Sequence, residues 1–73
     1  MSRLSELART LADQAAKANI ESYCGASDED FFYDITTGDE EVADDIAHSV
    51  EYLELRGKLQ RHPSNPNFVT VTE

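Results

Sequence analysis

Apolar residues recur at helical spacing near the N-terminus of the chain. The members of this set are Leu4, Leu7, Leu11, Ala15 and Ala18, which follow one another at steps of three and four. That period places them on one stripe of a helix whose other side carries polar residues, and it predicts a helix over residues 3–19. Two interpretations stay open beyond Asn19: the helix ends there, or it continues with a second face formed by Ala16, Ile20 and Tyr23.

A short second helix is predicted over residues 28–35. Ser27 and Asp30 have the spacing of a capping box, and acidic residues are favoured at the positive end of a helix dipole. Phe31, Phe32 and Ile35 are expected to supply bulky core side chains. The segment 31–38 fits an extended conformation equally well, so this alternative stays open.

The clearest helix signal covers residues 39–56. Thr37 and Glu40 again have capping-box spacing, and the apolar residues that follow recur at helical intervals. These residues are Val42, Ile46, Val50 and Leu53. Gly57 is expected to end the helix, because glycine accepts the left-handed conformation found after helix C-termini.

A β-hairpin is predicted over residues 59–72. Side-chain character alternates from Leu59 to His62 and again from Phe68 to Thr72, as in half-buried strands. The intervening segment PSNPN, residues 63–67, is predicted to be the connecting loop, because proline and asparagine are typical turn residues. The chain is therefore predicted to be an α+β domain of three helices followed by a hairpin.

Length and composition restrict the class of protein. Seventy-three residues are enough for one domain, residues 1–73, and a hydrophobic content of 40% favours a folded chain over a disordered one. Cys24 is the only cysteine, which excludes an internal disulfide. The sequence shows neither a signal-peptide pattern nor about twenty consecutive apolar residues, so we expect a soluble, cytoplasmic protein without membrane contact.

Charge is distributed very unevenly. Fifteen acidic residues face six basic ones, which gives a net charge of −9. No basic residue occurs between Ala18 and Leu55, whereas twelve of the fifteen acidic residues lie in that interval. The chain thus carries a block of negative charge and not a mixed surface.

The segment VEYLELRGKLQRHPSNPNFVTV resembles the passage from the third helix to the wing in the winged helix-turn-helix superfamily. The resemblance implies a winged-helix-like fold and, as one functional alternative, a DNA-binding transcriptional regulator that uses Arg56, Lys58 and Arg61. It also implies that the third helix would enter the major groove. That helix is rich in carboxylates, which DNA phosphates repel, so charge argues against this alternative.

The function that we expect from the charge block is binding to a protein with a basic, nucleic-acid-binding surface. Acidic side chains at helical spacing would imitate the phosphates of DNA and block such a partner. The predicted partner-binding residues are Asp28, Glu29, Asp30, Asp39, Glu40, Glu41, Asp44, Asp45 and Glu51. In size and charge the chain is similar to small acidic phage-encoded inhibitors such as anti-CRISPR proteins. Two other interpretations are a surface that serves solubility alone and a dimerising scaffold module. The oligomeric state stays open, with a homodimer as one of the alternatives.

Residues capable of catalysis are few. His48 and His62 are the only imidazoles and Cys24 the only thiol, and no nucleophile motif or phosphate-binding glycine loop accompanies them. Carboxylates are dense around residues 28–41, but Phe32 and Tyr33 interrupt the alternation that an EF-hand requires. We therefore predict a non-enzymatic protein with no catalytic residues, no cofactor and no metal site.

Overall fold

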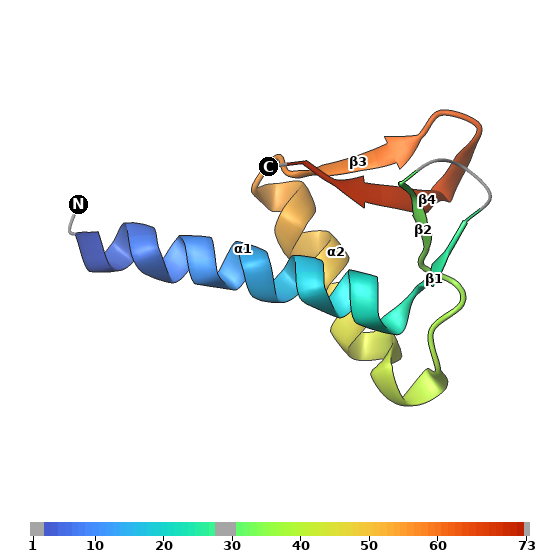
Figure 1. Cartoon of the computed structure of the whole chain (residues 1–73), viewed down its shortest axis with the longest axis horizontal. Helices are drawn as coiled ribbons and strands as arrows, with labels where there is room; N and C mark the ends of the chain where they lie inside the picture. Colours follow the sequence, from blue (N-terminus) through green and yellow to red (C-terminus); the bar gives the residue numbers. More distant parts are fainter. Residues whose placement is uncertain (1–2, 28–30, 73) are drawn as a thin grey trace.

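A computed structural model of the chain describes residues 3–27 and 31–72 (Figure 1). The elements follow in the order α1 (Arg3–Tyr23), β1 (Gly25–Ala26), β2 (Tyr33–Asp34), the 3-10 helix η1 (Glu40–Val42), α2 (Ala43–Leu55), β3 (Leu59–His62) and β4 (Asn65–Val71). The described residues thus form two α-helices and a four-stranded antiparallel sheet. This confirms the α+β class, whereas the prediction of three helices in a winged-helix-like arrangement is wrong.

The sheet has the strand order β1-β2-β4-β3, with every neighbouring pair antiparallel. β4 lies centrally because it pairs on one side with β2 and on the other with β3. Tyr33 and Arg61 both face Val69 in the register, and the β3–β4 pairing shifts between Arg61 and His62. The predicted hairpin is therefore present, but it is half of a larger sheet.

The second predicted helix, over residues 28–35, is wrong where the structure describes it, since Tyr33–Asp34 is strand β2. Residues 28–30, including Asp28, Glu29 and Asp30, lie outside the described residues. Ser27, the expected cap, instead donates its hydroxyl to the Phe32 carbonyl at 3.1 Å, and its amide donates to the same oxygen at 2.9 Å. Aromatic residues favour strands, and here sheet pairing prevails over the capping signal.

Thr37 also differs from its predicted role as a helix cap. Its hydroxyl accepts the Gly25 amide at 2.5 Å and donates to the Asp34 carbonyl at 2.7 Å, so it joins β1 to the end of β2. The helical region that follows begins as η1 and continues as α2, with no side-chain cap at either start. The third predicted helix, 39–56, therefore exists as a 3-10 turn followed by a shorter α-helix.

Of the two interpretations of the first helix, the structure agrees with the continued helix that has a second apolar face: Ala16 and Ile20 are buried, although Tyr23 is exposed. α1 continues to Tyr23, and its buried residues are Asp13, Ala16 and Ile20, followed just beyond the helix by Cys24. Leu11 and Ile20 lie on opposite sides, because nine residues make about two and a half turns. The leucine stripe is exposed, and the N-terminal half of α1 extends beyond the rest of the molecule (Figure 1).

The core lies between the two helices and the sheet. Three side chains at its centre are completely buried: Ile20 of α1, Leu53 of α2 and Val69 of β4. Both helices and the sheet therefore contribute to the centre of the core. The other buried apolar residues are Ala16, Cys24, Ile46 and Val50. Asn19 also donates its side-chain amide to the Ser49 hydroxyl at 3.2 Å across the helix pair. Small residues at this contact permit close approach of α1 and α2.

α2 ends at Leu55, and Gly57, the predicted stop, follows the C-cap Arg56 with a φ of 69°. The Lys58 amide donates to the Leu53 carbonyl at 2.8 Å and the Gly57 amide to the Glu54 carbonyl at 3.0 Å, which is the Schellman arrangement. The following hairpin turns earlier than predicted: β3 ends at His62 and β4 already begins at Asn65. The predicted loop of residues 63–67 is therefore mostly strand.

The turn at Gly57 brings two cations to one carboxylate. Asp13 is only 8% exposed, and it accepts Arg56 Nε at 2.9 Å, Arg56 Nη2 at 3.0 Å and Lys58 Nζ at 2.8 Å. These hydrogen bonds, from Arg56 first and Lys58 second, hold the pKa of the Asp13 carboxyl well below its usual range. Asp13 thereby ties α1 to the end of α2 and the start of β3.

We expect Asp13→Asn to lower the Tm at pH 7 by on the order of 5–10 °C, because Arg56 and Lys58 lose their counter-charge. A carboxyl whose folded pKa is depressed stabilises the fold above its unfolded pKa of about 3.9, and this contribution disappears as the pH falls further. The Tm difference between wild type and variant should therefore narrow below about pH 4. Thermal unfolding followed by circular dichroism from pH 7 to pH 3 measures it, with the exposed Asp44→Asn as control. A constant difference across this range would contradict the role assigned to Asp13.

Leu53 and Leu55, two residues apart on α2, provide a matched test of the core. Leu53→Ala should lower the free energy of unfolding by about 2–5 kcal/mol, because it leaves a cavity at a completely buried position. Leu55→Ala should change it by less than about 0.5 kcal/mol, since Leu55 is 88% exposed. Urea titration gives both values, and Ile46→Val, with an expected loss of about 0.5–1.5 kcal/mol, serves if Leu53→Ala does not fold. Equal losses at Leu53 and Leu55 would contradict the packing.

Candidate functional site

The acidic face comprises six of the nine predicted partner-binding residues. Asp39 precedes η1, Glu40 and Glu41 lie in it, and the rest follow on α2. All of them are exposed: Asp39, Glu40, Glu41, Asp44, Asp45 and Glu51. The structure therefore brings these six carboxylates to one helical segment, while the three remaining candidates fall on residues 28–30, which are not described.

One row of this face runs along the outer side of α2. Asp44, His48, Glu51 and Leu55 are all exposed, and they follow each other at steps of three and four. The opposite side of the helix packs into the core through Ile46, Ser49, Val50 and Leu53. Burial of that side fixes the rotation of α2, so the carboxylates of the row point away from the molecule.

Within the described residues, no salt bridge involves any of the six carboxylates of the acidic face. Glu40, Glu41, Asp44 and Asp45 lie in the first turns of η1 and α2, where the helix dipole favours negative charge. Glu51 lies in the second half of α2, whose last turn contains no basic residue. The dipole thus accounts for the N-terminal acids and not for Glu51.

The cations of the C-terminal segment are occupied within the fold. Arg56 and Lys58 bind Asp13, and Arg61 binds Glu54 and donates to the Pro66 carbonyl at 2.6 Å. Each of the three residues assigned to DNA contact by the winged-helix resemblance therefore has an acidic partner in its own chain. Their charges do not offset the acidic face.

Two hollows flank α2. One lies between α1 and α2 and is floored by alanines, among them Ala12 and Ala15, with Asp45, His48 and Tyr52 on the α2 side. The other lies on the opposite side of α2 and includes Ile35, Glu51 and Arg61. Both hollows are open to solvent, and each is bordered by a residue of the acidic face, Asp45 in the first and Glu51 in the second. A partner that binds α2 would therefore meet a surface with concave regions as well as negative charge.

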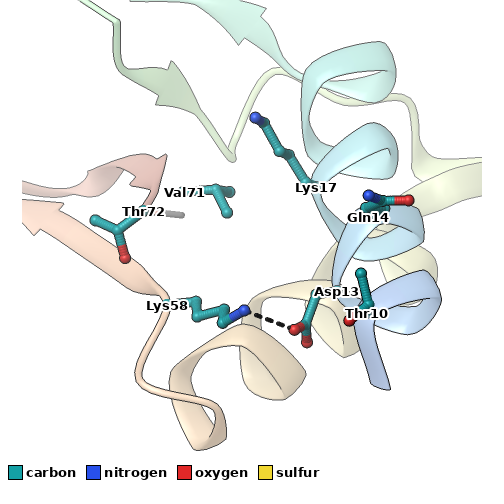
Figure 2. Close-up of a pocket in the computed structure, with 7 residues that line it drawn as sticks. All are labelled: Thr10, Asp13, Gln14, Lys17, Lys58, Val71 and Thr72. Carbon is teal, nitrogen blue, oxygen red and sulfur yellow. Dashed lines mark hydrogen bonds and ion pairs between the residues drawn. The ribbon is translucent and has the colours of Figure 1, made fainter. Parts of the chain in front are cut away.

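A further pocket of about 240 Å³ lies between α1 and the β3–β4 hairpin (Figure 2). Thr10, Gln14 and Lys17 line it from α1, while Val71 and Thr72 face them from the other side. Lys58 crosses its base to reach Asp13 (Figure 2). The polar groups at the bottom are therefore engaged with each other, and the pocket is better described as the solvent side of the Asp13 cluster than as a ligand site.

Groups with potential for catalysis are separated from one another. Cys24 is buried, and burial, together with the charge of Asp34, raises the pKa of its thiol. His48 is exposed on α2. His62 lies between Phe32 and Phe68, with ring centroids 5.1 and 6.3 Å away, and its Nδ1 accepts the Ser64 amide at 3.0 Å. Nothing in this arrangement pairs a thiolate with a base.

Sequence patterns missed the largest exposed apolar groups. Leu4, Leu7 and Leu11 form the predicted apolar stripe and Phe31 was expected in the core, but all four side chains are exposed. Phe31 also has a φ of 64°, which is rare for a bulky residue. The signal that could have identified the exposed stripe is the second apolar face of α1, since a helix with two such faces can bury only one in a small domain.

Two features are absent from the described residues. These residues contain no cluster of three or more His, Cys, Asp or Glu side chains arranged to hold a metal ion. Nor does any helix in residues 3–27 and 31–72 combine the length and apolar character needed to span a bilayer. Comparison of the chain with protein-family models, with curated proteins and with solved structures found no match.

Proposed function

We propose that this chain is a non-enzymatic binding protein that docks its acidic face on the basic surface of a nucleic-acid-handling protein and blocks it as a DNA mimic. The observation that carries the proposal is the segregation of charge. The six carboxylates of the acidic face are exposed and outside any salt bridge of the described residues, whereas Arg56, Lys58 and Arg61 are occupied elsewhere.

Such a face is costly for a small domain, which supports a role beyond solubility. Like charges one helical turn apart destabilise a helix by about 0.2–0.5 kcal/mol per pair, and Glu51 lies beyond the N-terminal turns in which the helix dipole favours an acidic residue. A surface of mixed charge would give solubility without this cost. An acidic face without basic residues is better explained by a complementary, basic partner.

The spacing of the carboxylates supports mimicry of a phosphate row. Asp44 and Glu51 lie two turns apart on the exposed side of α2, and each turn advances about 5.4 Å. Asp45 and the residues of η1 widen the row into a face. A protein that binds DNA phosphates through lysine and arginine would find negative charges at a similar spacing on α2. The electrostatic attraction would increase the rate at which the two proteins associate.

The alternative of a winged-helix regulator has no specific observation in its favour. The described residues do not have the three-helix arrangement on which that resemblance depends. The cations that would contact phosphates already bind Asp13 and Glu54.

Tagged protein should retain a basic nucleic-acid-binding protein from a lysate treated with nuclease. Asp44→Lys with Asp45→Lys should reduce retention at least tenfold, because two attractive contacts become repulsive. Glu51→Lys should also weaken retention without a loss of fold, since a cation in the second half of a helix suits its dipole. Added duplex DNA should displace the chain from the retained protein, and raising the salt concentration should release it.

The matched control is Glu6→Lys with Glu21→Lys, which changes the net charge by the same amount but places the lysines on α1. It should retain the partner nearly as well as the wild type, provided that circular dichroism shows all variants folded. Equal loss in both pairs would mean that total charge matters and the acidic face does not. Retention that DNA leaves unaffected would refute mimicry, and retention of nuclease-sensitive material alone would favour DNA binding.

A further inference from the structure

The exposed stripe of α1 is the main apolar feature of the surface that the acidic face does not explain. Leu4, Leu7 and Leu11 are 76%, 54% and 56% exposed, and Ala15 and Ala18 continue the same line. The first buried residue of the helix among those with described side chains is Asp13. The leucines therefore lie on the part of α1 that extends beyond the core (Figure 1).

We propose that this stripe binds the same stripe of a second copy of the chain, with the two α1 helices antiparallel. The proposal is independent of the function assigned to the acidic face, because the three leucines lie on α1 whereas the acidic face belongs to η1 and α2. Of the five stripe residues, Ala15 borders the hollow between α1 and α2. The resulting complex is a homodimer related by a two-fold axis near Leu11.

The sequence of the stripe is self-complementary about Leu11. Its members are spaced three, four, four and three residues apart, so the spacing is the same in both directions. An antiparallel copy centred on Leu11 places Leu4 opposite Ala18 and Leu7 opposite Ala15. Leu4 and Leu7 then each meet an alanine, which lets the helices approach closely, and Leu11 meets Leu11 of the second copy at the axis. Such an isologous contact uses one patch twice, as two-fold symmetry requires.

The charge of α1 permits a second copy to approach. Residues 1–23 contain three basic and three acidic side chains, so the net charge of −9 comes entirely from the rest of the chain. The basic residues are Arg3, Arg9 and Lys17, and the acidic ones are Glu6, Asp13 and Glu21. Pairing through α1 therefore brings together the electrically balanced part of each copy. A strongly acidic chain would, by contrast, be repelled from an anionic membrane, the other usual occupant of an exposed leucine stripe.

The extent of the stripe predicts a dimer of modest affinity. From Leu4 to Ala18 it spans about 21 Å of helix, so a helix pair of this length falls at the small end of specific interfaces, below about 1,200 Å² in total. Each copy carries the same negative charge, and screening should strengthen the dimer as salt is added. This dependence is opposite to that expected of the complex made by the acidic face.

Sedimentation equilibrium of the full chain, over a range of concentrations and at low and high salt, tests the proposal. The mass should rise with concentration toward twice the chain mass of 8.2 kDa. Leu7→Gln with Leu11→Gln should raise the dissociation constant of the dimer at least tenfold. Leu55→Gln, which changes a more exposed leucine outside the stripe, should leave it unchanged. Circular dichroism verifies that each variant is folded, as expected for positions outside the core. A wild-type chain that stays monomeric throughout would overturn the proposal.

Cysteine cross-linking tests the orientation. Leu11→Cys should form an interchain disulfide on mild oxidation, because residue 11 meets itself across the two-fold axis, while Leu4→Cys should not. The wild type, with its single buried Cys24, provides the background. Cross-linking of Leu4→Cys as strongly as Leu11→Cys would show parallel helices and refute the antiparallel dimer. A monomer that sediments with phosphatidylcholine or phosphatidylglycerol vesicles, and no longer does so after Leu7→Gln with Leu11→Gln, would assign the stripe to a membrane instead.

Discussion

The contact of Asp13 with Arg56 and Lys58 determines how the parts of this small domain fit together. Asp13 belongs to α1, whereas its partners flank the Gly57 turn between α2 and β3. A nearly buried carboxylate without partners would be strongly unfavourable, so the face of α1 that contains it must turn toward the two cations. Once that face is turned inward, Ala16, Ile20 and Cys24 follow it into the core, because they lie on the same side of the helix.

The same contact shapes the electrostatic surface. Two of the six basic residues of the chain are used to neutralise Asp13, and Arg61 is used by Glu54. Little positive charge is then left near α2 to offset Asp44, Asp45 and Glu51. The acidic face is thus a consequence of where the cations are placed as much as of how many carboxylates the chain contains. The placement of the cations therefore produces both the ion pairs within the fold and the excess negative charge on the surface of α2.

Sequence patterns located some elements well and failed at others for identifiable physical reasons. The end of α2 before Gly57 and the presence of a C-terminal hairpin follow from local rules, since glycine and alternating side chains act within a few residues. The prediction of a helix after Ser27 was wrong because a serine hydroxyl can form a hydrogen bond either in a helix cap or in a turn between strands. The pairing of Tyr33 with Val69, which is distant in the sequence, favours the strand. The exposure of each acidic-face residue was predictable from the helical period, but the pairing of Arg56 with Asp13 spans 43 positions and leaves no local signal.

The orientation of α1 illustrates the most general limit of such patterns. Hydrophobicity alone favours burial of the three leucines, yet the helix buries alanine, isoleucine and an aspartate instead. Small residues allow α2 to pack closely, and Asn19 and Ser49 add a hydrogen bond across that contact. Leucines on the inner face would hold the helices further apart and leave Asp13 away from its cations. A chain of this length has core volume for only one of the two apolar faces of α1. The face with polar partners in the same chain is buried, and the leucine stripe remains exposed.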